Sequence, residues 1–277
     1  MIIDFHIHAG DLDDLTPWAK DYFLQFTKLM GVFEGGALIP EKLINYLDNC
    51  CVDYAVVLPE YSPKAYGTVT VEKAYSLCKT SKKFILFSNI NPWITKNPVR
   101  VFLYEYERFG SRGVKLHPVH QSFYPNDRLL YPLYEKLEEL ELPLLVHTGS
   151  SIFHGAKARF GNPLYLDEVA ADFPQLNIVL AHGGRGYFYR EAEYLAESHE
   201  NVFIEVSGLP PFKLTEYFPS ISRNHQKFIF ASDWPGIKDL KKNISDIKAL
   251  PLDENALENI LFRNAAKLLK IDERDCK

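Results

Sequence analysis

Eight short apolar runs, separated by longer amphipathic segments, form the main pattern along the chain. The runs are rich in Val, Ile, Leu and Phe and show little polar alternation before their carboxyl ends. This pattern is typical of strands that are buried on both faces of a parallel sheet. We therefore predict a strand for each run, over residues Ile2–His8, Val52–Pro59, Phe84–Ile90, Gly113–His117, Leu142–His147, Asn177–His182, Val202–Val206 and Phe228–Ser232.

The segments between the runs have helical spacing. The clearest example is Asp127–Glu141, where one face collects Leu129, Leu130, Leu133, Tyr134, Leu137 and Leu140. Residues Asp253–Leu269 repeat the pattern, with Asp253 as the predicted N-cap. Eight strand–helix units in series imply parallel strands with right-handed crossovers. The sequence thus predicts an α/β fold of the (β/α)8 TIM-barrel type, with residues 1–277 as one domain. An open doubly wound sheet is the structural alternative.

The connection after the first run, Ala9–Gly36, is unusually long. It contains an acidic cluster and an apolar piece from Trp18 to Val32. Loops of this length in a compact domain usually have a function or carry a helix of their own. We expect this long first βα loop to be a lid or a subunit contact.

Charge and cysteine content narrow the class of protein. The formal net charge is −5, from 31 basic and 36 acidic residues. This balance does not indicate a protein that binds nucleic acid or a membrane surface through basic residues. No stretch approaches the ~20 apolar residues of a membrane span. The cysteines form no CxxC pair; they are Cys50, Cys51, Cys78 and Cys276. Polar residues interrupt the N-terminus where a secretory signal would be apolar, so a cytoplasmic protein is expected.

Residues with metal-binding or acid–base chemistry gather at the carboxyl ends of the predicted strands. In an eight-stranded parallel barrel, the active site lies at that end. In strand order these residues are His6, His8, Lys115, His117, His147, His182, Glu205, Ser207 and Asp233. The sequence therefore predicts a site at this rim of the barrel.

The spacing of His6 and His8 places two imidazoles side by side. Alternate residues of a strand share a face, so we expect both rings to point into the barrel mouth, with Phe5 and Ile7 facing the helices. Paired imidazoles suit a borderline metal such as zinc.

His147 and Asp233, from other strands, can complete a metal shell of three nitrogens and one oxygen. Such a cation lowers the pKa of bound water to ~7. A single strand histidine is more often structural, and His154, His199 and His225 are assigned that role. Asp233 could instead cap the helix that follows it.

These motifs resemble a known family. The opening, Ile3-Asp4-Phe5-His6-Ile7-His8, resembles that of the amidohydrolase superfamily. Further motifs agree in order: Gly113-Val-Lys-Leu-His-Pro118, Leu145-Val-His147-Thr-Gly149, Leu180-Ala-His182-Gly-Gly184, Ala231-Ser-Asp233-Trp-Pro235 and Asn264-Ala-Ala-Lys-Leu-Leu269. The pattern is similar to that of the amidohydrolase 2 group, which includes aminocarboxymuconate semialdehyde decarboxylase and related hydrolases. The resemblance extends from residue 2 to about residue 269.

The resemblance implies roles for the rim residues. His6, His8, His147 and Asp233 would bind the metal, and Asp233 would also accept a proton from the metal water. His182 would polarise the substrate, move a proton or bind a second metal.

The chemical state of Lys115 distinguishes a site with one metal ion from a site with two. In binuclear relatives the lysine on the fourth strand is carbamylated and, with His182, binds a second ion. An unmodified Lys115 would instead attract a substrate carboxylate, or form an ion pair with Glu205 or Asp233. One ion, Zn²⁺ or another divalent metal, is favoured because the group is mainly mononuclear, and two are possible.

Two further residues are predicted to contact the substrate. Arg185 could hold a carboxylate in a bidentate fork, with a surface ion pair as its alternative, and Trp234 follows the last strand. The expected partner is a small molecule, without nucleic acid or membrane, and a homodimer is expected from the group.

The predicted function is metal-dependent hydrolysis. Metal-activated water would cleave a C–N or C–O bond of an amide, ester or lactone, with Asp233 as base and His182 assisting. The alternative on the same site is a non-oxidative decarboxylase, a carbon–carbon lyase acting on a small carboxylic acid. A non-catalytic barrel would be expected to lack one of the metal-binding residues, and none of them is missing. A phosphoesterase fits the sequence motifs less well.

Overall fold

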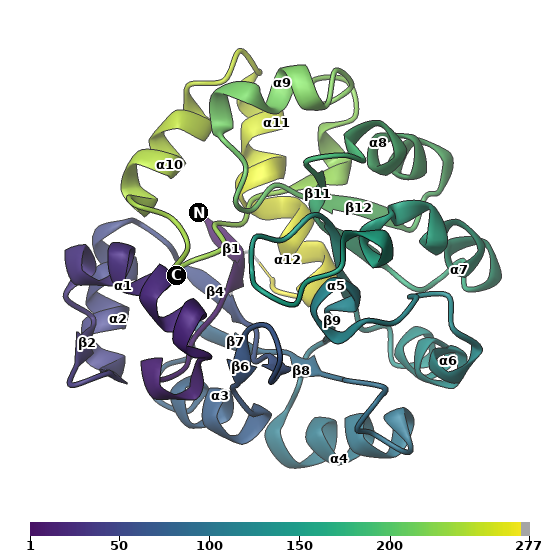
Figure 1. Ribbon diagram of the computed structural model, residues 1–277. Coiled ribbons are helices and arrows are strands. Elements are labelled where there is room, and N and C mark those ends of the chain that lie inside the picture. The colour runs from purple at the N-terminus through teal and green to yellow at the C-terminus, as the bar shows by residue number, and fades with distance from the viewer. Residues whose placement is uncertain (273–277) are drawn as a thin grey trace.

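The chain forms a closed barrel of parallel strands inside a ring of helices (Figure 1). The computed structural model describes residues 1–272, except for the side chains of residues 27–30. In chain order the barrel strands are β1 (Ile3–Ile7), β4 (Tyr54–Val57), β7 (Phe84–Leu86) continued by β8 (Ser88–Asn89), β9 (Val114–Leu116), β10 (Leu144–Gly149), β11 (Ile178–Arg185), β12 (Val202–Glu205) and β13 (Phe228–Ile229). The predicted TIM-barrel fold is confirmed.

Backbone hydrogen bonds close the barrel between its first and last strands. The strand order is β1-β4-β7 and then β8-β9-β10-β11-β12-β13, because the third strand changes partner at Phe87. At the seam, Phe5 N donates to Phe230 O at 3.2 Å, and Asp233 N donates to His6 O at 3.0 Å. The sheet is therefore closed, and the open doubly wound alternative is excluded.

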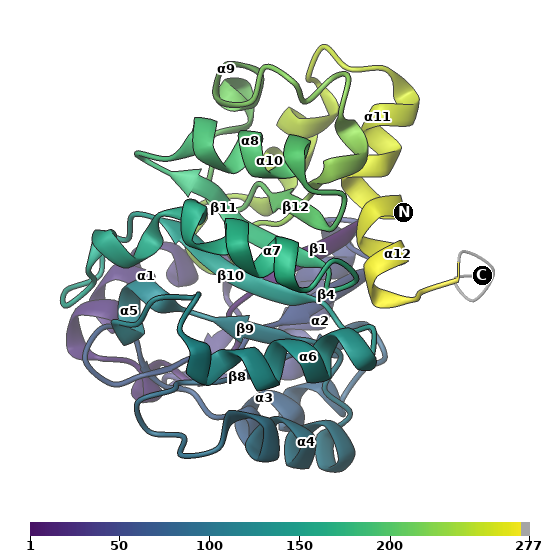
Figure 2. The same cartoon turned by 90° about the vertical axis from the view of Figure 1, so that its right-hand side faces the viewer.

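Helices cover the outside of the barrel and connect successive strands (Figures 1 and 2). The main ones are α2 (Pro40–Asn49), α3 (Val71–Cys78), α4 (Pro98–Phe109), α6 (Tyr131–Glu139), α7 (Asp167–Asp172), α8 (Tyr189–Ser198) and α10 (Leu240–Lys248). Shorter α-helical turns are α5 (Pro118–Gln121) and α9 (Leu214–Tyr217). Short 3-10 helices are η2 (Arg128–Leu130), η3 (Ala158–Gly161), η4 (Pro163–Leu166), η5 (Pro211–Lys213) and η6 (His225–Lys227).

The C-terminal helical segment is continuous but unevenly wound. It comprises α11 (Glu254–Glu258), a π-helical turn η7 (Asn259–Arg263) and α12 (Asn264–Leu269), and Asp253 is its N-cap as predicted. In the π turn, the amide of Asn264 bonds to the carbonyl of Asn259. The Ile260 carbonyl instead accepts from Phe230 N at 2.7 Å. The wide turn thus attaches this helix to the end of β13.

Two apolar clusters hold the layers together. The larger one lies between the strands and the surrounding helices. The smaller one fills the barrel interior with residues from the strands and is completed by α12, which lies across one end of the barrel (Figure 2). The carboxyl ends of the strands, and the predicted site, lie at the other end.

Phe5 faces the barrel interior, so its predicted orientation towards the surrounding helices is wrong. Its ring lies 5.7 Å from that of Phe87 in the inner cluster, whereas Ile7 joins the outer cluster as expected. The reason is an irregularity in β1, whose register against β4 shifts between Asp4 and Ile7. Simple alternation therefore does not hold along this strand.

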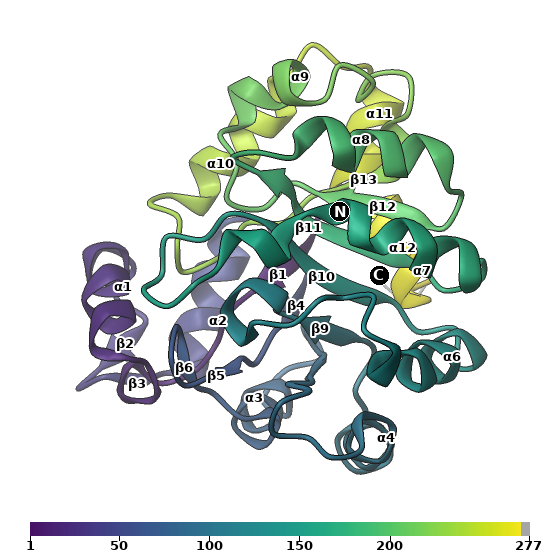
Figure 3. The same ribbon diagram turned by 45° about the vertical axis from the view of Figure 1, so that its right-hand side comes forward.

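The long first connection is folded and covers the barrel mouth. It contains η1 (Leu12–Asp14), α1 (Pro17–Met30) and the hairpin β2 (Phe33–Glu34) and β3 (Ala37–Leu38), beside a second hairpin, β5 (Tyr61–Ser62) and β6 (Gly67–Thr68) (Figure 3). Tyr22 and Phe23 of α1 line a cavity at the barrel mouth, and Phe23 packs in a small cluster with Tyr66. This is the position that a lid requires.

Two further observations concern membrane-spanning helices and cysteines. In the part of the chain that is described, no helix is both long and apolar enough to cross a bilayer. Cys50, Cys51 and Cys78 are free thiols, and Cys276 lies outside the described residues. The described part of the fold is therefore held together without a disulfide.

Glu105 of α4 gives a prediction about stability. Burial raises its pKa to about 7, and among the described residues its Oε2 atom has no hydrogen-bond partner. The folded state therefore binds a proton more tightly than the unfolded state, so the stability contribution is full at low pH and is lost as the pH rises towards 7. We expect the free energy of unfolding to fall by up to about 3 kcal/mol between about pH 4.5 and 7. Glu105→Gln should flatten this dependence in urea titrations.

The matched control is Glu107→Gln, which changes an exposed carboxylate on the same helix. It should keep the wild-type slope of stability against pH. The same slope in Glu105→Gln would contradict the assignment to the buried carboxyl.

Candidate metal centre and active site

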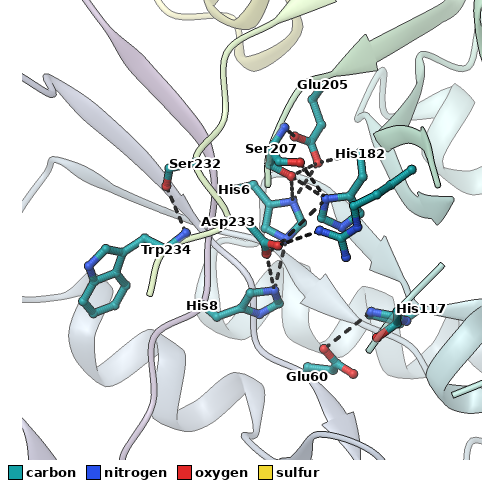
Figure 4. A network of polar contacts seen from close by, with 12 residues as sticks. His6, His8, Glu60, His117, His182, Glu205, Ser207, Ser232, Asp233 and Trp234 are labelled. Atoms are coloured by element: carbon teal, nitrogen blue, oxygen red, sulfur yellow. Dashed lines mark hydrogen bonds and ion pairs between the residues drawn. The ribbon is translucent and has the colours of Figure 1, made fainter. Parts of the chain in front are cut away.

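Three side chains of metal-binding type converge where the first and last strands meet (Figure 4). His6 Nε2 lies 3.0 Å from His8 Nε2 and 3.5 Å from Asp233 Oδ1, and His8 Nε2 lies 3.6 Å from the same oxygen. Donors that each lie 2.0–2.2 Å from one tetrahedral ion are about 3.3–3.6 Å apart. The three atoms therefore have close to the spacing of ligands on a single cation.

Glu205 of β12 holds His6 in the tautomer that metal binding needs. Its fully buried carboxylate accepts a hydrogen bond from His6 Nδ1 at 2.7 Å. Because Nδ1 carries the hydrogen, Nε2 presents its lone pair towards His8 and Asp233. Glu205, His6 and His182 also form a close group of metal-binding type, but 2.7 Å is a hydrogen-bond distance. We conclude that Glu205 orients a ligand.

Burial keeps the imidazoles at the rim uncharged. It holds the pKa values of His6, His147 and His182 well below the usual range, and it lowers the pKa of His8. An uncharged imidazole has a free lone pair, which is the form that binds a metal.

His147 of β10 has polar atoms that the protein does not satisfy. Its side chain is buried, and neither ring nitrogen has a hydrogen-bond partner among the described residues. A buried polar atom without a partner costs about 1–3 kcal/mol, unless a bound group supplies the contact. The donor set of His6, His8 and Asp233 thus fits a divalent cation, whereas His147 lies outside this close group and stays a predicted ligand.

Two site residues have left-handed backbone conformations. The φ angle is 62° at His182 and 66° at Asp233, values that are uncommon for residues other than glycine and often occur at functional sites. His182 Nδ1 lies 3.0 Å from the Ser207 carbonyl oxygen. Because a carbonyl only accepts, Nδ1 carries the hydrogen and Nε2 is an acceptor. His182 is therefore suited to receive a proton or to bind a cation.

Lys115 of β9 is a buried cation beside these groups. Its side chain is 1% exposed, and in the described part of the chain its Nζ has no hydrogen-bond partner. Burial lowers its pKa to about 8, and the attraction of Glu205 and Asp233 opposes that shift. Burial likewise raises the pKa of Glu205 to about 7, opposed by Lys115. Lys115 and Glu205 are thus electrostatically coupled, and a contact of Lys115 with substrate or a second metal stays a prediction.

Arg185 reaches the cluster because two glycines leave room for it. Its Nη1 donates to Asp233 Oδ2 at 3.3 Å. A Cβ at Gly208 would lie 2.5 Å from that nitrogen, and a Cβ at Gly149 would lie 2.3 Å from the Arg185 backbone. Any side chain at either position would displace the guanidinium from its place at the barrel mouth.

The site opens into a cavity of about 240 Å³. Most ligand pockets have volumes of 300–1,000 Å³, so this one favours a small molecule. Six of the predicted residues line it: His8, His117, His147, His182, Arg185 and Asp233. His6 and Lys115 are fully buried.

Trp234 does not belong to this cavity, so we correct its predicted contact with the substrate. Its side chain is fully buried and its ring is nearly parallel to that of Phe33 at 6.3 Å, with Tyr46 at 6.5 Å. In Figure 4 it points away from His6 and His8. A residue that follows a strand end can turn to either side, and here the ring packs under the first connection.

Sequence reasoning did not find the roles of four site residues. Glu205 lies behind His6, outside the lining of the cavity, and the sequence predicts it only as an ion-pair partner of Lys115. Glu60, His120 and Ser151 line the cavity, and Glu60 directly follows the second predicted strand. The strand-end rule could therefore have identified Glu60, whereas the other two lie in connections whose course the sequence pattern does not define.

The role of Glu205 leads to a prediction about metal affinity. In Glu205→Gln, the side-chain amide can donate to His6 Nδ1 and leave the hydrogen on Nε2. We expect a 10- to 100-fold weaker affinity for divalent metal, about the usual effect of losing a carboxylate behind a histidine ligand. Competition with a chromophoric chelator measures it. Glu197→Gln, at an exposed ion pair with Arg223, is the control, and equal affinities in both variants would contradict the assignment.

Comparison with known proteins gives local sequence matches and close structural matches. A 2-keto-4-carboxy-3-hexenedioate hydratase from Sphingobium sp. is 35% identical over 68 residues, which cover 21% of this chain and 20% of the hydratase. Protein fluG from Emericella nidulans is 33% identical over 94 residues, 34% of this chain and 10% of that protein. The chain thus matches only a small part of either curated relative.

Solved structures match over almost the whole chain. An uncharacterized TIM-barrel protein from Bordetella bronchiseptica has a TM-score of 0.81 at 24% identity, over 98% of each chain. A 2,6-dihydroxybenzoate decarboxylase from Rhizobium has a TM-score of 0.73 at 16% identity, over 98% of this chain and 99% of that one. The amidohydrolase family model matches residues 92–271, more than half of the sequence. With its histidine-rich barrel mouth, the chain belongs to the amidohydrolase family.

Proposed function

We propose that this enzyme is a metal-dependent hydrolase that cleaves a C–N or C–O bond, in an amide, ester or lactone, of a small carboxylate-bearing molecule. The observation that carries the proposal is the convergence of His6 Nε2, His8 Nε2 and Asp233 Oδ1 within 3.6 Å of one another at the cavity. Arg185, a cation beside the same cavity, suits a substrate carboxylate.

Four residues would hold the ion: His6, His8, His147 and Asp233. Imidazole with one carboxylate suits zinc, although other divalent ions accept the same ligands. When bound, a divalent cation supplies Lewis acidity, which polarises a substrate carbonyl and makes water more acidic.

The side chains around the ion would carry out proton transfer. Asp233 and His182 both face the cavity as proton acceptors, the first as a carboxylate and the second through Nε2. Water adds to the carbonyl carbon while one of them takes its proton, and the same proton then passes to the leaving nitrogen or oxygen. Arg185 would position the carboxylate end of the substrate.

Non-oxidative decarboxylation is the second candidate function. It is favoured by the hydrogen bond from Arg185 to Asp233 Oδ2 at 3.3 Å, which occupies an oxygen that a water-activating base would use. In a decarboxylase the substrate carboxylate leaves as CO₂ and a proton takes its place, so no water proton has to be accepted.

Assays in ¹⁸O-labelled water separate the two functions. Metal-loaded protein is incubated with a panel of carboxylate-bearing amides, esters, lactones and aromatic acids, and products are identified by mass spectrometry. Hydrolysis places one ¹⁸O atom in the released acid, and chelator-treated protein gives no product from the amides and lactones. Release of CO₂ with an unlabelled organic product would establish the second function, and the absence of both reactions would overturn the proposal.

A further inference from the structure

A second polar chain lines the cavity beside the metal cluster. Glu60 Oε1 lies 2.6 Å from His120 Nδ1, and His120 Nε2 lies 2.7 Å from Ser151 Oγ. Glu60 and His120 are buried, and all three residues line the cavity. Figure 4 shows Glu60, next to His117, on a different side of the site from His6 and Asp233. None of the three belongs to the predicted metal ligands.

The partners determine where the hydrogens lie. Burial alone would raise the pKa of Glu60, but the neighbouring His120 outweighs it, so this pKa lies below its ordinary value. A carboxylate only accepts, so His120 Nδ1 carries the hydrogen. In the tautomer with this single ring hydrogen, His120 Nε2 holds a lone pair and accepts a hydrogen bond from the Ser151 hydroxyl at 2.7 Å. The result is a serine hydroxyl bonded to an imidazole, which a buried carboxylate orients in turn.

Glu60, His117 and His120 also form a close group of metal-binding type, but the contacts favour the hydrogen-bonded chain. His117 Nδ1 accepts the backbone N–H of His120 at 3.3 Å, so its hydrogen is on Nε2, the atom that faces Glu60. The contact of 2.6 Å between Glu60 and His120 is also well below the roughly 3.3 Å that separates two ligands of one ion.

We propose that Ser151, His120 and Glu60 form a second catalytic unit in which Ser151 is the nucleophile, and that it acts on activated esters of small acids without the metal. The arrangement is that of a nucleophile, its base and an orienting group. Arg185, whose Nη2 donates to the carbonyl of neighbouring Ser150 at 3.4 Å, places a positive charge in the same cavity as Ser151.

The reaction balances with water as the only co-reactant. Ser151 Oγ bonds to the ester carbonyl carbon as its proton passes to His120 Nε2. The C–O bond to the alcohol breaks, and the alcohol leaves with that proton. Water then adds to the acyl carbon, the bond from that carbon to Ser151 Oγ breaks, one water proton passes through His120 to Ser151 Oγ, and the free acid is released.

An alkyl fluorophosphonate probe tests the nucleophile without a known substrate. Ser151 Oγ forms a P–O bond, the P–F bond breaks, fluoride leaves with the electron pair, and the serine proton goes to His120. The full-length protein is stripped of metal with a chelator and incubated with the probe. Digestion and mass spectrometry should then locate the adduct on Ser151.

Three variants and a matched control assign the roles. Ser151→Ala should abolish labelling. Ser150→Ala changes a neighbouring serine that is also half-buried and is bonded to the Arg185 carbonyl instead of an imidazole, so this variant should label like wild type. His120→Ala and Glu60→Gln should slow labelling by about 100-fold or more. Glu60→Gln keeps the shape of the side chain but can reverse the His120 tautomer, so a merely structural role would leave the rate unchanged.

The outcome is independent of the proposed hydrolase function. Labelling of Ser151 in His6→Ala as well as in the wild type supports a unit that needs no metal, even if every metal-dependent assay fails. Unlabelled Ser151 in folded wild-type protein would overturn the proposal, as would equal rates in wild type and Glu60→Gln, whatever activity the metal site shows.

Discussion

An Asp233→Asn variant is expected to lose about 1,000-fold or more in kcat/KM for the metal-dependent reaction. Asparagine has the same shape and keeps an oxygen near His6 and His8, but it cannot receive a proton. General acid–base groups contribute about 10²–10⁴-fold to rates, and the loss of the charge opposite Arg185 adds to the effect. Steady-state kinetics on the substrate found in the labelled-water assays measures this loss.

Asp246→Asn is the control, because Asp246 is a surface carboxylate paired with Lys242 on α10. It should leave kcat/KM unchanged. If Asp233→Asn retained more than about a tenth of wild-type kcat/KM, Asp233 would not be the proton acceptor, and the decarboxylase function would gain support.

A Lys115→Met variant is expected to lose about 3 kcal/mol of stability at about pH 8, because it removes one partner of a buried, coupled pair. Without the cation, burial raises the pKa of Glu205 further, so the folded state holds a proton that the unfolded state releases. The loss should therefore be smaller at about pH 6 and grow as the pH rises. Urea unfolding of metal-free protein at both pH values measures it.

The double variant Lys115→Met/Glu205→Gln separates charge from packing. It removes both partners, so it should recover most of the stability that the single variant loses at about pH 8. A double variant no more stable than Lys115→Met would show that packing of the lysine stem, and not its charge coupling to Glu205, accounts for the loss.

The strands and the residues at their carboxyl ends could be predicted because both follow from the regular pattern of apolar and polar residues along the chain. Strands buried on both faces read as continuous apolar runs, and their carboxyl ends place polar residues on one rim. His8, His147, His182 and Asp233 indeed lie around one cavity. The same reasoning, applied to the second strand, would have included Glu60.

Other features of the site depend on local irregularities of the backbone, which the pattern of apolar and polar residues does not reveal. The register shift in β1 turned Phe5 inward against simple alternation. The left-handed conformation at Asp233 immediately precedes Trp234, whose ring packs on Phe33 and not on the cavity. The chain from Glu60 through His120 to Ser151 joins three separate connections, and only tertiary structure brings such segments together.

The metal content of the purified protein tests the central claim, that His6, His8, His147 and Asp233 converge on one divalent cation. Elemental analysis is made on wild type, on His6→Ala and on a control, His199→Ala, whose ring is paired with Asp167. We predict about one equivalent of metal per chain in the wild type and the control, and less than about a tenth in His6→Ala. A wild-type protein that binds no divalent metal, or a His6→Ala variant that binds as much as wild type, would contradict the account.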